Sequence, residues 1–224
     1  LEAELEAELE ARKKQYAVYR DQLLSFPEAG GVRWIPLGEA VSIATNRISA
    51  NLVHQDNFVG LENLIPNFGG VKPSEYAPET GQVIEYGPTD VLFGNIRPYL
   101  NKVWHADRTG GASPDVLVLR TNKAYEDQLL PRFKFFVITA DRFMTQVEAG
   151  SRGAKMPRGD KRKMLQINIP IPPLEEQERI VEILDRFDAL VNDISIGLPA
   201  ELKARRAQYE YYRDKLLSFE EQVA

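Results

Sequence analysis

Residues 7–26 read AELEARKKQYAVYRDQLLSF, and residues 200–219 repeat them as AELKARRAQYEYYRDKLLSF. Fourteen of the twenty aligned positions are identical at a constant offset of 193 residues, which marks a true internal repeat. Apart from the charged Arg12 and Arg205, apolar side chains in each copy recur at alternating spacings of three and four, as in a helix that packs on another helix. They are Leu9, Tyr16, Tyr19, Leu23 and Phe26 in the first copy, and Leu202, Tyr209, Tyr212, Leu216 and Phe219 in the second. The alternative is two surface helices that cover one globular core.

Length and composition bound the class of protein. The 224 residues suffice for one ordinary domain with extended helices, and the 43% hydrophobic content suits a folded protein. No apolar run is long enough to span a membrane, and no leader pattern indicates secretion. The chain has no Cys, and its two His are too few for a His-rich metal site. We therefore expect a cytoplasmic protein without a membrane or metal partner.

Charge is distributed unevenly along the chain. Residues 31–169 hold 17 Lys and Arg against 14 Asp and Glu, a balance of +3. The remaining ends hold 11 basic and 19 acidic residues, a balance of −8. The middle is therefore the better candidate for a polyanionic partner, although this modest asymmetry does not identify DNA by itself.

The N-terminal residues form a four-residue repeat. Residues 1–12 read LEAE, LEAE and LEAR, all of which are strong helix formers. The helix is predicted to continue through Phe26 and to end at residues 27–31, PEAGG. One reading is a solvated, frayed helix. The functional reading is a spacer whose length changes by whole repeat units with little change of facing.

The middle of the chain is predicted to be mixed α+β. Short apolar runs predict strands at residues 58–61, 82–84, 90–96, 102–105 and 115–120. Residues 69–70 and 110–111, both Gly-Gly, are expected to mark turns. Residues 131–147 keep apolar spacings of three and four and predict a helix.

A basic segment follows at residues 150–163, GSRGAKMPRGDKRK, which its Gly and Pro residues predict to be a loop. Its basic residues are Arg152, Lys155, Arg158, Lys161, Arg162 and Lys163. Such a loop can follow a phosphate backbone with its amides and long side chains. The alternative is an ordinary solvated loop. Weaker candidates for contact with DNA are Asn95, Arg97 and Lys102.

A long helical arm ends the chain. Residues 167–173, INIPIPP, predict an extended linker, because Pro fixes φ and removes hydrogen-bond donors. The following helix has an apolar seam formed by Ile180, Leu184, Phe187 and Val191. Gly-Leu-Pro at residues 197–199 interrupts it before the second repeat copy begins. The arm is too long to bury this seam on one domain of this size, so we expect it to pair with another arm.

No convincing catalytic constellation is present. The sequence lacks a phosphate-binding Gly-rich loop with Lys-Ser/Thr and a Gly-x-Ser-x-Gly nucleophile turn. The paired acids at residues 126–127 and 175–176 are better explained as surface and helix-start residues. The sequence therefore favours a binding or adaptor role without catalysis.

These motifs together resemble the DNA-specificity (S) subunit of type I restriction-modification enzymes. Residues 34–39, WIPLGE, are similar to the opening of its target-recognition domain. Residues 167–183, INIPIPPLEEQERIVEI, are similar to the exit into its conserved helix, and the repeated QYxxYRDxLLSF resembles the far end of that helix. The four-residue repeats resemble spacer repeats of some members. The resemblance spans nearly the whole chain.

The resemblance implies a particular architecture and set of partners. It implies an N-terminal conserved helix at residues 1–28, a target-recognition domain at 29–172 and a long conserved helix at 173–224. Family members usually carry two recognition domains, so this chain resembles a half-subunit that pairs through antiparallel coiled-coil helices with a second copy or another half. The pair would read a bipartite, palindromic target on double-stranded DNA. Methyltransferase subunits would supply the S-adenosylmethionine site, and a restriction subunit would use ATP and Mg; this chain would need no cofactor.

The repeat adds a hypothesis about the paired state. Its two copies either compete for one position beside the recognition domain or join a small helical bundle. Two other classes of protein stay open: a coiled-coil scaffold that binds only protein, and a recognition fragment of a fused restriction enzyme.

Overall fold

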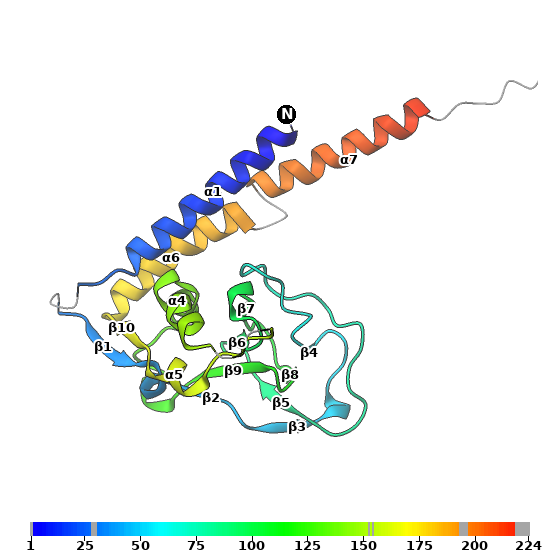
Figure 1. The fold of residues 1–224 in the computed structure, drawn as a ribbon. Coiled ribbons are helices and arrows are strands. Elements are labelled where there is room, and N and C mark those ends of the chain that lie inside the picture. Colours follow the sequence, from blue (N-terminus) through cyan, green and yellow to red (C-terminus); the bar gives the residue numbers. More distant parts are fainter. Residues whose placement is uncertain (1, 28–30, 152, 154, 193–196, 218–224) are drawn as a thin grey trace, which may run out of the picture. The chain divides into compact units, whose positions relative to one another are not determined.

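A computed structural model describes residues 2–27, 31–151, 153, 155–192 and 197–217 (Figure 1). The chain forms two compact units. The larger runs from Arg20 to Val181, and the smaller combines Leu1–Tyr19 with Glu182–Ala224. The larger unit therefore contains the strand-rich middle of the sequence.

Strands of the larger unit form three sheets. The first pairs β1 (Arg33–Pro36) with β10 (Asn168–Ile171). The second has the order β2 (Val41–Ile43), β9 (Val116–Thr121), β6 (Val91–Gly94), β7 (Val103–His105). The third has the order β3 (Arg47–Ser49), β5 (Gln82–Tyr86), β8 (Gly110–Ala112), β4 (Phe58–Val59). Strand β4 runs parallel to β8, and the other pairs within the described residues are antiparallel.

Helices of the larger unit are mostly short. They are α2 (Leu37–Ala40), α3 (Pro131–Thr139), α4 (Asp141–Gly150), α5 (Lys161–Gln166), and the 3₁₀-helices η1 (Ala50–Leu52), η2 (Pro98–Leu100) and η3 (Lys123–Tyr125). The single helix predicted at residues 131–147 is two helices, because Ala140 is extended at φ −65° and ψ 145°. Its apolar spacing survives because both helices bury one face: Phe133, Phe136, Phe143 and Met144 are all at most 4% exposed.

The mixed α+β prediction is confirmed, and most predicted strands lie within one or two residues of their expected positions. Strand β6 is buried along its whole length, as its continuous apolar run indicates. The strand predicted at residues 58–61 is shorter than expected, since β4 has two residues. Tyr86 of β5 meets Trp104 of β7 edge to face, with ring centroids 5.8 Å apart. This contact joins the second and third sheets in one core.

The Gly-Gly pair at residues 110–111 lies inside strand β8, so its prediction as a turn is wrong. A Cβ on Gly110 would lie 2.0 Å from the carbonyl oxygen of Asn57, and one on Gly111 would lie 2.4 Å from a methyl carbon of Val83. These glycines therefore permit close packing within the sheet. The pair at residues 69–70 does form a turn, in which Gly69 donates to the Pro66 carbonyl and Gly70 has φ +88°.

The segment predicted as an extended linker is a paired strand. Residues 168–171 form β10, whose register places Arg33 opposite Ile171 and Pro36 opposite Asn168. Pro170 is compatible with this position because the strand belongs to a two-stranded sheet, where its missing N–H can face away from the partner. The first and last strands of the larger unit are thus paired with each other.

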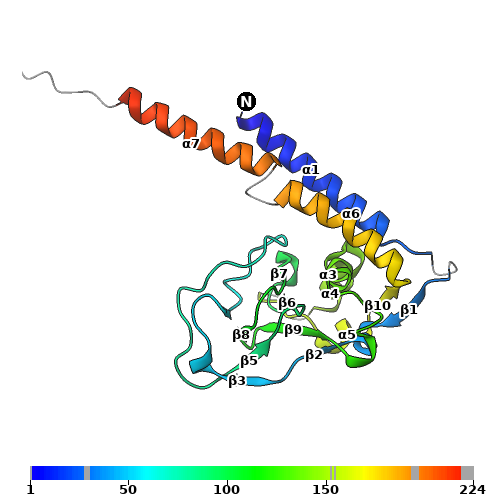
Figure 2. The ribbon, with the colours of Figure 1, turned by 180° about the vertical axis from the view of Figure 1, so that it is seen from behind.

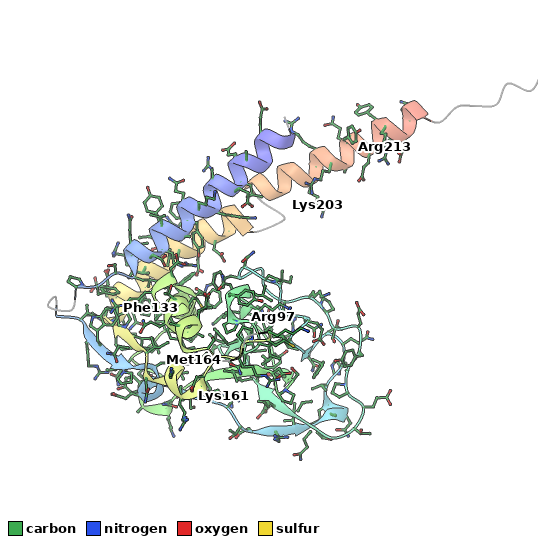
Figure 3. All side chains as sticks on the ribbon, viewed as in Figure 1. Arg97, Phe133, Lys161, Met164, Lys203 and Arg213 are labelled. Carbon is green, nitrogen blue, oxygen red and sulfur yellow. The ribbon has the colours of Figure 1, made fainter. Side chains whose placement is uncertain are left out.

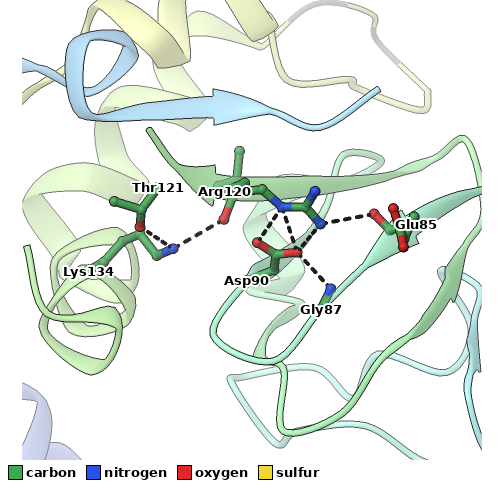
Figure 4. Close-up of polar contacts among 7 residues, drawn as sticks. Glu85, Gly87, Asp90, Arg120, Thr121 and Lys134 are labelled. Carbon is green, nitrogen blue, oxygen red and sulfur yellow. Dashed lines mark hydrogen bonds and ion pairs between the residues drawn. The ribbon is translucent and has the colours of Figure 1, made fainter. Parts of the chain in front are cut away.

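A buried polar network joins the sheets to helix α3 (Figure 4). Arg120 of β9 donates to the Asp90 carboxylate, with a shortest distance of 2.6 Å, and to the Glu85 carbonyl of β5 at 3.4 Å. Lys134 of α3 donates to the Thr121 hydroxyl at 2.9 Å. Burial lowers the pKa of Lys134 to about 8. The network satisfies buried charges that an apolar core would not accommodate.

The smaller unit is helical. Its residues come from α1 (Glu2–Leu23), α6 (Leu174–Asn192) and α7 (Gly197–Leu217), and α1 and α6 lie side by side and run in opposite directions in both views (Figures 1 and 2). The predicted interruption at residues 197–199 coincides with the first turn of α7, where Pro is tolerated. None of the described helices combines the length and the apolar character needed to cross a membrane.

Candidate nucleic-acid interface

The basic segment at residues 150–163 is divided between a loop and the start of helix α5. Gly150 ends α4, and Asp160 caps α5 by accepting hydrogen bonds from the backbone N–H groups of Arg162 and Lys163 at 3.0 and 3.3 Å. The prediction of one continuous loop is therefore wrong beyond Asp160, because an N-cap and good helix formers follow there. The side chains of Lys161, Arg162 and Lys163 are exposed on α5, and Arg152 lies outside the described residues.

Two chain segments far apart in sequence meet beside this helix. Ile96 and Arg158 form an isolated antiparallel β-bridge. The N–H of Arg97 donates to the Pro157 carbonyl at 2.7 Å, and the N–H of Gly159 donates to the Asn95 carbonyl at 3.1 Å. The bridge thus brings the predicted candidates at 95–97 together with the basic loop, which sequence spacing alone could not establish.

Cations on both sides of the bridge face solvent. The side chains of Arg97, Lys155 and Arg158 are exposed. Arg158 also lies 3.3 Å from Asp115, in a pair whose side chains are 60% and 41% exposed. Such a surface ion pair contributes little stability, so a phosphate could replace the carboxylate at small cost. Arg97 and Lys161 are both marked on the larger unit in Figure 3.

The loop that carries Arg97 is conformationally strained. Arg97 and Asn101 flank η2 with φ values of 52° and 51°, in the left-handed region. A neighbouring loop contains two more such residues, Asn67 and Phe68, whose N–H groups donate to the carbonyls of Leu100 and Asn101. Left-handed non-glycine residues cost on the order of 1 kcal/mol or more each and persist where the surroundings fix them, often at functional sites.

Two of the weaker candidates for contact with DNA, Asn95 and Lys102, are less exposed than the described cations of the basic segment. Asn95 is 6% exposed, and a Cβ on Gly159 would lie 2.8 Å from its Oδ1. Lys102 donates from Nζ to the Leu61 carbonyl at 2.8 Å, and partial burial lowers the pKa of this ammonium group. The Lys102 side chain thus holds a neighbouring loop, whereas the buried Oδ1 of Asn95 has no hydrogen-bond partner among the described residues.

An exposed aromatic residue was missed from the sequence. Tyr99 in η2 is 49% exposed, two residues after Arg97. An exposed ring beside cations is suited to stacking on a base or sugar. The signal was present as Arg-Pro-Tyr-Leu-Asn-Lys, an aromatic residue between two basic ones, but that pattern also fits a buried tyrosine.

The titratable side chain of His105, in the larger unit, is packed into the fold. Burial lowers the pKa of His105 to about 4, and its ring packs edge to face on Phe135 at 5.9 Å. The described residues contain no group of three or more His, Cys, Asp or Glu side chains that could hold a metal ion.

The predicted helix-pairing residues have mixed environments. Ile180 and Leu184 are fully buried, and Tyr19 stacks on Phe187 with ring centroids 5.8 Å apart. Leu9, Tyr16 and Leu23 are half-buried. Tyr209 and Tyr212 of α7 are 65% and 52% exposed. The remaining predicted pairing residues lie outside the described side chains: Val191, Leu202, Leu216 and Phe219.

Comparisons with known proteins agree on one family. A family model described as "Type I restriction modification DNA specificity domain" matches residues 112–204. The specificity subunit of the Escherichia coli type I restriction enzyme EcoR124I/EcoR124II is 35% identical over 98% of this chain and 56% of its own length. The putative type I specificity subunit S.MpnORF615P of Mycoplasma pneumoniae is 30% identical over 99% of this chain and 88% of its own length.

Solved structures share the fold. The HsdS subunit from Thermoanaerobacter tengcongensis superposes with a TM-score of 0.55 at 21% identity, covering 92% of this chain and 55% of that one. The S subunit from M. genitalium gives a TM-score of 0.57 at 15% identity, covering 88% and 49%. The chain thus spans about half the length of these structures.

Proposed function

The chain belongs to the specificity subunits of type I restriction-modification systems, and we propose that its larger unit reads a half-site on double-stranded DNA. The observation that carries this proposal is the β-bridge between Ile96 and Arg158. The bridge brings together exposed cations from two segments that are distant in the sequence. Within the described part of the chain, these cations are not held by buried acidic partners. Phosphate groups are the ligands that such a surface favours.

Residues of this surface have two different tasks. Lys155, Arg158 and the cations of α5 contact phosphates, which position the domain without reading sequence. Arg97 and Tyr99 lie on the strained loop, whose fixed backbone suits them to contact base edges. Arg97 is the stronger candidate, since a guanidinium can donate two hydrogen bonds to guanine.

The helical unit supplies the second part of the proposal. Helices α6 and α7, with exposed tyrosines at 209, 211 and 212, pair two copies of the chain in an antiparallel coiled coil. A two-fold pair reads a palindromic, two-part target, and helix length sets the gap between the half-sites. Methyltransferase subunits with S-adenosylmethionine dock on this pair, and a restriction subunit adds cleavage driven by ATP and Mg. The chain itself is non-catalytic and works in the cytoplasm, where the DNA lies.

Methylation mapping tests this function. The chain is co-expressed with a cognate methyltransferase subunit, and host DNA is sequenced for modified adenines. A palindromic bipartite motif modified on both strands is the expected result. An asymmetric motif would mean that the chain pairs with a different half. The absence of any motif would contradict the DNA-reading role and favour the protein-binding scaffold.

A further inference from the structure

The end of the first repeat copy, from Arg20 onward, belongs to the larger unit and is held there by a specific set of contacts. The Arg20 side chain is 4% exposed and donates to the Asp141 carboxylate at 3.0 Å. Its guanidinium also lies over the Phe68 ring, 5.5 Å from the centroid. Asp21 accepts a hydrogen bond from the backbone N–H of Asp141 at 3.1 Å. We call Phe68, Ala140 and Asp141, with the cavity described below, the repeat slot.

An apolar cavity extends the repeat slot beside Leu24. Leu24 is 6% exposed and lines a cavity of about 120 Å³ with Trp34, Val137 and Phe143. The Tyr-Arg-Asp-x-Leu-Leu-Ser motif therefore places a cation, an acid and a leucine in the repeat slot, at Arg20, Asp21 and Leu24. Phe68 is held in place by the strained loop, in which its N–H donates to the Asn101 carbonyl at 2.9 Å.

The second copy of the repeat carries the same three residues, and its Arg213 and Asp214 are exposed. Arg213, Asp214 and Leu217 correspond to Arg20, Asp21 and Leu24 at the repeat offset. Arg213 pairs with its chain neighbour Asp214 at 2.8 Å, and these side chains are 48% and 68% exposed. Figure 3 marks Arg213 on α7. A buried arginine in the first copy thus has an exposed equivalent in the second.

We propose that the second copy of the repeat in one chain occupies the repeat slot of a second copy of this chain, in exchange for that chain's own first copy. This proposal rests on the proposed pairing of two chains. Arg, Asp and Leu stand at the same three positions in both repeat copies, and the arginine of either copy matches the charge of the Asp141 carboxylate. The slot is therefore complementary to either copy. Each slot holds one arginine at Asp141, so the two copies compete and the first copy limits the affinity of pairing.

A pair of charge-reversed chains tests the exchange directly. The first chain carries Arg20→Asp with Asp141→Arg, which preserves an opposite-charge pair within the chain. The second carries Arg213→Asp alone. In a homodimer of the first chain, Arg213 meets the new arginine at position 141; in a homodimer of the second, the new aspartate at position 213 meets Asp141. Both contacts are between like charges. In the mixed dimer, each slot instead joins an arginine to an aspartate. We expect each chain alone to dimerise at least tenfold more weakly than the wild type, and a 1:1 mixture to restore dimer formation, measured by sedimentation velocity.

Two single substitutions that only remove the charge keep the proposal testable if the charge-reversed chains fold poorly. Arg213→Gln is expected to weaken dimerisation several-fold, whereas Arg20→Gln, the same substitution in the other copy, is expected to strengthen it. Circular dichroism tests whether both variants fold.

Several results would overturn the exchange. One is a wild-type chain that stays monomeric at about 100 μM. Another is a 1:1 mixture of the charge-reversed chains that does not recover dimer formation. The third is an equal effect of the two Gln variants on dimerisation. Weakened dimerisation by both Gln variants would instead indicate a bundle that holds both copies together. Methylation mapping of the wild type reports on DNA reading independently, so failure of the exchange is distinguishable from failure of the proposed function.

Discussion

The guanidinium of Arg158 lies 3.3 Å from the carboxylate of Asp115 while its backbone is bridged to Ile96. In the proposed DNA-bound state, a phosphate would compete with this carboxylate for Arg158. The ion pair itself adds little to the stability of the fold, because exposed pairs contribute at most about 1 kcal/mol.

Removal of this competitor is expected to tighten DNA binding. Asp115→Asn should raise affinity up to about fivefold near 0.1 M salt, since it deletes one negative charge and releases Arg158. Fluorescence anisotropy with target duplex measures the change. Asp107→Asn, which breaks the comparable surface pair with Arg108, is the control. Equal effects of the two variants would mean that only net charge matters.

Loss of a phosphate contact is expected to change the salt dependence of binding. Arg158→Ala and Lys161→Ala should each reduce the slope of log affinity against log salt by about 1 without altering the methylated motif. Lys123→Ala on η3 makes the same charge change elsewhere and serves as the control. Unchanged affinity and slope in both test variants would remove the basic segment from the interface.

Arg97 is expected to affect sequence preference. Arg97→Ala should relax the motif at one position, with a loss of about 1–3 kcal/mol against the preferred base, because a bidentate contact to a base edge is removed. The methylated motif of the variant measures this effect. A motif identical to that of the wild type, with lower affinity alone, would reassign Arg97 to phosphate contact.

Lys134 is expected to give the fold a distinctive alkaline pH dependence. Its pKa is about 8 in the folded chain and near 10.5 when unfolded, so the unfolded state binds more protons between these values. Folding stability should therefore rise through this contribution from pH 8 to 10.5. Lys134→Met should remove that rise in urea titrations performed at several pH values. A parallel pH profile for the variant and the wild type would show that Lys134 is not the responsible group.

Gly110 is expected to tolerate no side chain. Gly110→Ala would place a Cβ 2.0 Å from the Asn57 carbonyl oxygen, so we expect a loss of about 1–3 kcal/mol or more in unfolding free energy. Gly87→Ala is the matched control, because its Cβ would meet its nearest neighbour, Asp90, at 3.9 Å. Thermal unfolding of the two variants measures the difference.

Sequence patterns predicted the helices and strands that are determined by residues close together in the chain. Continuous apolar runs located β6 and β9, and the repeat located α1 and α7. The same reasoning misplaced Gly110–Gly111 and the strand β10, because close backbone approach and partner choice depend on residues far away in the chain. Asp160 followed by Lys-Arg-Lys-Met-Leu-Gln did carry an N-cap signal for α5, which the neighbouring Gly and Pro obscured.

The candidate site was only partly accessible from sequence. The cations of the basic segment were identified by composition, but their meeting with Arg97 depends on a bridge across 62 positions, from 96 to 158. The contact of Arg20 with Asp141 spans 121 positions, and no periodicity encodes such a partner. The burial of Asn95 likewise follows from the approach of Gly159.

The pairing of β1 with β10 has a consequence for how the chain folds. Arg33 and Ile171 are opposite each other although 138 positions separate them in the chain, from 33 to 171. Closing so long a loop costs more conformational entropy than closing the short loop between neighbouring strands. We therefore expect this strand pair to form late, after the hairpin of β6 and β7 has condensed. During synthesis the domain would remain open until the ribosome has released β10.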